Sequence, residues 1–197
     1  MSIFNITEQL KPKHGLKSLR KVDYIVIHHI QAKNATWQDI NNWHKNNGWS
    51  CAGYNEYIRK DGTVYIMRGD HVGAHCYGFN SYSYGIALEG DFQTEHINQV
   101  QYDKLIERIK FHQSRFKDSQ VKGHEELGST ACPGKNFPLY QLKKDLKKEY
   151  TIDESIQILV DHGIIKSPKY WLANAKRDKV CNGLYVQYLI QNFAKKL

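Results

Sequence analysis

Strand-like and helix-like stretches alternate along most of this 197-residue chain, and their alternation limits the fold more than any other feature of the sequence. Apolar side chains recur at every second position in some stretches and at helical spacing in others. In chain order, the pattern predicts a strand at 24–27, a helix at 36–48, a hairpin turning at Asp61-Gly62, a strand at 85–92, and helices at 99–117 and 139–146. Interleaved elements are typical of an α/β fold, so we expect a mixed central β-sheet flanked by helices.

The last part of the chain has a pattern of its own. The charged stretch at 143–155 predicts a boundary between one domain at 1–150 and a small, mostly helical module at 151–197. Thr151 and Glu154 have the spacing of a capping box, which marks the start of a helix. We therefore expect the second module to begin with a helix at this point.

The net charge narrows the choice of partner without deciding it. The chain has 28 Lys and Arg residues against 20 Asp and Glu residues, a net charge of +8. Nucleic acid, an anionic bacterial cell wall and a membrane surface all fit such a charge. No recognised nucleic-acid-binding motif is present, and no apolar run approaches the roughly 18 residues that a membrane span needs. The N-terminus has no apolar signal-peptide core, so we expect synthesis in the cytoplasm and no stable membrane insertion.

The stretch GHEELGSTACPG at 123–134 places His124 and Cys132 in a sequence too irregular for a helix. The predicted strand at 24–27 delivers two more histidines, His28 and His29, at its end. A single histidine or cysteine is most often a packed structural residue. A metal ligand, a nucleophile and a plain packed loop therefore remain three open interpretations of Cys132.

Five separated blocks resemble one known family. They are VIHH at 26–29, WHKNNGWSCAGYNEYI at 43–58, DGTVY at 61–65, GAHCYGFNSYSYGIALEGDF at 73–92 and GHEELGSTACPG at 123–134. In this order and at this spacing they resemble the zinc-dependent N-acetylmuramoyl-L-alanine amidases of the peptidoglycan-recognition-protein and phage-lysozyme type. The resemblance extends over roughly residues 20–146.

The resemblance implies a zinc site formed by His28, His124 and Cys132. Two imidazoles and a thiolate are a sensible ligand set for zinc, and three protein ligands leave a fourth position open for catalysis. The side chain of His29 points to the opposite face of the strand, so we expect it to pack or to form hydrogen bonds instead.

The resemblance also implies two catalytic residues. Tyr54 would orient the reacting water and assist proton transfer. Thr130 would donate a hydrogen bond to the oxyanion of the tetrahedral intermediate, at a position where some members of the family carry lysine.

A loop rich in glycine, histidine and tyrosine matches the family's substrate groove. It implies that His75, Tyr77 and Asn80 bind substrate, and Trp49 at the end of the first helix would add another wall. Aromatic faces and amide donors suit a ligand made of sugar and peptide.

The predicted function is hydrolysis of the amide bond between N-acetylmuramic acid and L-alanine in bacterial peptidoglycan, by a bacteriolytic enzyme of the phage endolysin type or by an autolysin. The helical module at 151–197 resembles the tails of some endolysins, which predicts cell-wall binding, although a cap that completes the fold is the alternative. Two other functions remain open. One is a non-catalytic peptidoglycan receptor, and the other is a cysteine hydrolase with Cys132 as nucleophile and His124 as base.

Overall fold

A computed structural model describes residues 2–147, 151–176 and 179–194 of the chain. Contacts divide it into two units, Met1–Leu146 and Lys147–Leu197. The predicted boundary after residue 150 lies outside the described residues. None of the helices in the described ranges is both long enough and apolar enough to cross a membrane.

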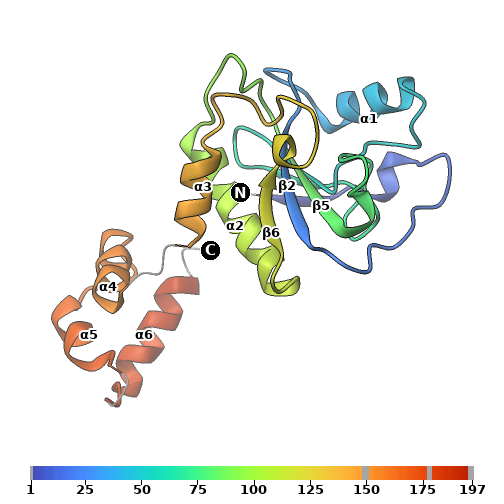
Figure 1. Ribbon diagram of the computed structural model, residues 1–197. Helices are drawn as coiled ribbons and strands as arrows, with labels where there is room; N and C mark the ends of the chain where they lie inside the picture. The colour runs from blue at the N-terminus through green and yellow to red at the C-terminus, as the bar shows by residue number, and fades with distance from the viewer. Residues whose placement is uncertain (1, 148–150, 177–178, 195–197) are drawn as a thin grey trace. The chain divides into compact units, whose positions relative to one another are not determined.

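In the described part of the larger unit, one six-stranded mixed sheet has the order β1-β4-β3-β5-β2-β6 (Figure 1). Its strands are β1 (Ile3–Asn5), β2 (Tyr24–His29), β3 (Glu56–Ile58), β4 (Val64–Ile66), β5 (Ser83–Leu88) and β6 (Gln120–Gly123). The helices are α1 (Trp37–Asn46), α2 (Gln99–Arg115) and α3 (Leu139–Leu146), with short 3-10 turns η1 (Glu8–Leu10), η2 (Asn80–Tyr82) and η3 (His124–Glu126). The predicted α/β fold with a mixed sheet is confirmed.

The sheet is parallel except at the predicted hairpin. Strand β3 pairs antiparallel with β4, and Tyr57 lies opposite Tyr65. Gly62 in the connecting turn has a φ of 80°, a conformation that favours glycine. The edge strands β1 and β6 are not predicted by the sequence, because three or four residues are too few to establish an alternating pattern.

Helices cover both faces of the sheet, and the side chains of β2 alternate between these faces (Figure 1). Ile25 and Ile27 belong to the core cluster that includes side chains of α2 and α3. A second cluster packs around α1. Alternation along the strand therefore places His28 on the α1 side and His29 on the α2 side.

Helix α1 begins where the sequence predicts, and Ile40 is buried in the cluster that Trp37 packs against. Thr36 and Asp39 form a reciprocal capping box at its start. Trp43, three residues after Ile40, is 43% exposed. The polar side chain of Asn41 takes a buried position instead, because its amide donates to the carbonyl of Leu10 and accepts from the N–H of Ala52.

The described part of the smaller unit is helical, with α4 (Ile152–Asp161), α5 (Pro168–Asn174) and α6 (Gly183–Ala194). Thr151 and Glu154 form the predicted capping box. The core consists of buried side chains from the helices and from the turn between α4 and α5: Ile156, Ile164, Ile165 and Trp171.

Candidate metal and catalytic site

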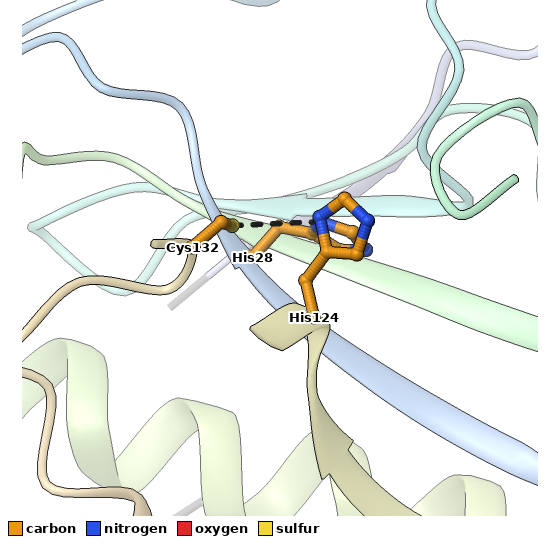
Figure 2. Close-up of side chains that lie close together, drawn as sticks. All are labelled: His28, His124 and Cys132. Carbon is orange, nitrogen blue, oxygen red and sulfur yellow. Dashed lines mark hydrogen bonds between the residues drawn. The ribbon is translucent and has the colours of Figure 1, made fainter. Parts of the chain in front are cut away.

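Three distant segments bring nitrogen and sulfur atoms together at one end of the parallel strands. Strands β2 and β6 pair in parallel with Ile27 opposite Gly123, so the next residue of each chain segment, His28 and His124, lies at the same end of the sheet. Cys132 reaches the same point from the loop that precedes α3 (Figure 2). One donor atom from each of the three residues lies within 4.8 Å of the others. We call these three residues the donor cluster.

The loop that carries Cys132 is held by its backbone. The N–H of Glu125 donates to the carbonyl of Cys132 at 2.7 Å. Gly134 has a φ of 107°, and a Cβ at this position would come within 2.6 Å of the backbone carbon of Phe92. Only glycine allows this close approach, so the loop is fixed against the segment that follows β5.

The donor set fits a zinc ion. The Sγ atom of Cys132 lies 3.6 Å from Nδ1 of His28, and the rings of His28 and His124 have centroids 4.5 Å apart. Ligand atoms around one tetrahedral zinc ion are roughly 3.3–3.8 Å apart, as the usual zinc–nitrogen and zinc–sulfur bond lengths require. Nitrogen and sulfur donors together are the combination that zinc prefers.

Burial keeps the donor cluster uncharged. Burial lowers the pKa of His28, and the nearby His75 and His124 lower it further. Burial also lowers the pKa of His124. Burial raises the pKa of the Cys132 thiol to about 12. Neutral imidazoles present lone pairs to a cation, and a bound cation would favour loss of the thiol proton.

Tyr54 lies beside the donor cluster. The centroid of its ring is 5.2 Å from that of His28 and 5.3 Å from that of His44. Desolvation raises the pKa of the Tyr54 phenol, and the neighbouring Cys132 raises it further. The phenol therefore keeps its proton and is available as a hydrogen-bond donor.

Thr130 lies two residues before Cys132 on the exposed side of the loop. Its Oγ1 accepts the backbone N–H of Cys132 at 3.2 Å. A hydroxyl that accepts a hydrogen bond still has its own proton to donate. Thr130 therefore holds the backbone of Cys132 and keeps a hydroxyl proton available for a second hydrogen bond.

The four predicted groove residues divide into two pairs. Tyr77 is 98% exposed and Trp49 is 41% exposed, so both offer ring surface to a ligand. Asn80 uses its Oδ1 to accept the N–H groups of His75 and Cys76, at 2.8 and 2.9 Å. His75 is buried, and its Nδ1 lies 3.0 Å from Nε2 of His28.

Two other histidines are engaged in the framework. The N–H of Phe92 donates to Nδ1 of His29 at 3.0 Å, and the two rings stack. His29 is therefore outside the donor cluster, as its place on the strand predicts. The N–H of Gly53 donates to Nδ1 of His44 at 2.8 Å, which holds the segment that carries Tyr54. The sequence assigns His44 only to helix packing, because a contact across the α1–β3 connection has no local signal.

Comparisons with known proteins agree with this arrangement. Residues 18–135 match the family model described as N-acetylmuramoyl-L-alanine amidase. The endolysin of Escherichia phage T7 is 27% identical over 139 residues, which are 66% of this chain and 92% of that protein. Peptidoglycan-recognition protein SC2 of Drosophila melanogaster is 34% identical over 129 residues, which are 59% of this chain and 70% of that protein.

A solved structure extends the agreement to the fold. The N-acetylmuramoyl-L-alanine amidase LysC from Clostridium intestinale is 34% identical, with a TM-score of 0.70, and the match covers 75% of this chain and 98% of that one. The fold and the donor cluster thus define an amidase of the peptidoglycan-recognition and endolysin class. The chain belongs to the N-acetylmuramoyl-L-alanine amidase family. The predicted family and class of enzyme are confirmed.

Proposed function

We propose that the protein hydrolyses the amide bond between N-acetylmuramic acid and L-alanine of peptidoglycan, with a zinc ion held by His28, His124 and Cys132. The observation that carries this proposal is the convergence of the three donors beside Tyr54. When bound, a zinc ion supplies Lewis-acid chemistry, which activates water and polarises a carbonyl group.

The protein's own groups would provide the remaining chemistry. The protonated Tyr54 phenol, whose ring lies beside that of His28, would orient a water molecule and assist proton transfer. The hydroxyl of Thr130, which accepts the N–H of Cys132, would donate a hydrogen bond to the oxygen that becomes negative as the amide is attacked. Trp49 and Tyr77 offer exposed rings for sugar and peptide.

Two observations argue against the alternative functions. A cysteine nucleophile requires a lowered thiol pKa, whereas burial raises the pKa of Cys132 to about 12. The nitrogen in hydrogen-bond contact with its sulfur, at 3.6 Å, is Nδ1 of His28, whereas the base assigned in the cysteine-hydrolase hypothesis is His124. A receptor without catalysis has no use for three metal donors, and this chain retains all of them.

Digestion of purified peptidoglycan tests the proposed reaction. We expect new L-alanine amino termini without new reducing sugar ends, loss of this activity after chelation, and its return with added zinc. Reducing ends without new amino termini would instead indicate a glycosidase and would overturn the proposal. Activity that survives chelation but is lost on thiol alkylation would favour the cysteine hydrolase.

We further propose that the protein acts as an endolysin, made in the cytoplasm and released to the cell wall to cause lysis. Endolysins of the phages T7 and KP32 among its relatives support this role. Expression of the full chain with a membrane-permeabilising protein should lyse cells, and expression of the chain alone should not. Lysis by the chain alone would contradict the need for release.

We also propose that the smaller unit binds the cell wall. A cavity of about 260 Å³ is lined by aromatic and polar side chains, among them Lys166, Trp171, Tyr185, Tyr188 and Asn192. Aromatic faces with a few polar groups suit a saccharide. Tyr188→Ala should reduce sedimentation with purified walls, whereas Tyr140→Ala, which removes an 83% exposed tyrosine from the larger unit, should not. Equal sedimentation of both variants would favour a purely structural role for residues 151–197.

A further inference from the structure

We propose that His75 is a positioning residue that fixes the tautomer of His28, so that Nδ1 of His28 is the nitrogen that binds the metal. This inference rests on the zinc site proposed above. The sequence assigns His75 to the substrate groove, but the structure places its ring behind the ligand ring of His28.

The two nitrogens of His28 face different neighbours. Nδ1 lies 3.6 Å from the sulfur of Cys132, and Nε2 lies 3.0 Å from Nδ1 of His75. His28 is 1% exposed and His75 is 7% exposed, so bulk water does not compete for this contact. Two facing imidazole nitrogens at this distance share one proton, so one nitrogen donates and the other accepts.

The hydrogen bonds of Ser83, the next residue in contact with His75, determine which of the two facing nitrogens donates. The hydroxyl of Ser83 donates to the backbone carbonyl of Phe79 at 2.8 Å, and a carbonyl can only accept. The Ser83 oxygen is then left as an acceptor for Nε2 of His75, 3.5 Å away. A protonated Nε2 leaves the lone pair of a neutral His75 on Nδ1.

The direction of donation along this hydrogen-bond chain also determines the tautomer of His28. Because Nδ1 of His75 accepts, Nε2 of His28 carries the proton and donates to it. The lone pair of His28 then lies on Nδ1, on the side of the Cys132 sulfur. Metal-binding histidines commonly donate their other ring N–H to a partner that fixes the ring and its tautomer.

The backbone around His75 is shaped to hold this ring. A Cβ added to Gly73 would come within 2.3 Å of the ring, and one added to Gly85 would come within 2.6 Å. Asn80 accepts the backbone N–H of His75 at 2.8 Å. Two glycines and an asparagine thus fix the ring where it contacts His28, a constraint that a residue serving only as a flexible substrate contact does not require.

Nitrogen NMR of the histidine rings in the zinc-loaded full chain tests the tautomers directly. We expect His28 and His75 each to carry a proton on Nε2, and the signal of Nδ1 of His28 to respond to the metal. A proton on Nδ1 of His75, or zinc bound through Nε2 of His28, would overturn the inference.

Two variants test the consequence for zinc affinity, measured by competition with a chromophoric chelator. His75→Leu removes the acceptor and should weaken zinc binding roughly 10- to 100-fold, the usual effect of losing a partner of a ligand histidine. His75→Asn places an amide oxygen near the position of Nδ1 and should restore most of the affinity. Tyr77→Leu, in the exposed part of the same loop, is the matched control and should leave zinc affinity unchanged.

The outcomes separate this inference from the proposed function. If the native protein binds no zinc, the proposed metal site itself fails. If the native protein binds zinc and His75→Leu raises only the KM for substrate, with unchanged zinc affinity and an intact thermal transition, His75 is a groove residue and the positioning role is wrong. The NMR measurement on the native chain keeps the test decisive if His75→Leu does not fold.

Discussion

Two buried polar clusters lie on opposite faces of the same sheet, and they differ in how their charges are balanced. The donor cluster of His28, His124 and Cys132 combines groups that burial keeps neutral. In the second cluster, the carboxylate of Glu56 is surrounded by donors. The first arrangement brings three metal-ligating atoms within 4.8 Å of one another, and the second surrounds a carboxylate with hydrogen-bond donors.

We call the second group the Glu56 cluster, and it consists of the Glu56 carboxylate and its hydrogen-bond partners. Arg108 donates to both carboxylate oxygens of Glu56, at 2.6 and 3.0 Å, and Tyr84 donates its hydroxyl at 3.0 Å. Nε2 of His112 lies 2.8 Å from the same carboxylate. Burial alone would raise the pKa of Glu56, but the hydrogen bonds from His112 and Arg108 hold it at about 2. Burial by itself therefore does not mark a functional cluster, whereas the convergence of three metal-ligating atoms does.

The largest effect that separates the clusters is expected for Cys132→Ala. Loss of one of three ligands should remove zinc and abolish amide hydrolysis while the chain stays folded. Cys51→Ala replaces another buried cysteine, outside the donor cluster, and should keep both zinc and activity. Metal analysis and the release of amino termini measure the two properties. Full activity of Cys132→Ala would show that the donor cluster is not the catalytic centre.

The Glu56 cluster should respond in the opposite way. Glu56→Gln leaves the Arg108 charge buried without its partner, which should lower the free energy of unfolding by about 3–5 kcal/mol without loss of zinc. Glu95→Gln removes the half-buried pair with Lys60 and should change it by less than about 1 kcal/mol. Denaturant unfolding and metal analysis provide the two readouts. Loss of zinc from folded Glu56→Gln protein would show that metal binding also depends on the Glu56 cluster.

Acid should destabilise the fold through Glu56. Its pKa is lower in the folded chain, at about 2, than in the unfolded chain, so its contribution is complete above about pH 5. As the pH falls toward 2, this contribution of about 3 kcal/mol should disappear. Unfolding curves of native protein and Glu56→Gln should therefore converge in acid. Parallel curves down to pH 2 would mean that the Glu56 carboxylate contributes no such stability.

Thr130→Val should have the smallest effect on the site. The variant keeps the three donors, so zinc content should not change, but loss of the hydroxyl donor should lower kcat roughly 100-fold. Thr130→Ser keeps a hydroxyl and should retain most of the rate. Steady-state kinetics on soluble muropeptides measures both. An unchanged kcat for Thr130→Val would remove Thr130 from the proposed chemistry.

The sequence predicts regular elements better than contacts between them. The helical period of α2 and the Asp61-Gly62 turn are local signals, and both elements are present. Cys132 and His28 are 104 residues apart and meet only because β6 pairs with β2. No local pattern reports that pairing, so the ligand set is predicted only through the family resemblance.

Two further contacts have no sequence signal. The contact between His75 and His28 depends on space left by Gly73, in the same loop, and by Gly85, on β5. The charge on Glu56 breaks the apolar pattern of its strand and is compensated from α2, which begins more than 40 residues later. Interactions of this kind are determined by tertiary packing and become visible only in the structure.

The most direct test is a crystal of active protein examined by anomalous scattering at the zinc absorption edge. We predict a single strong peak within bonding distance of Nδ1 of His28, a ring nitrogen of His124 and the sulfur of Cys132. Active protein with no peak there, or with its zinc bound elsewhere, would contradict the assignment of the donor cluster as the metal site.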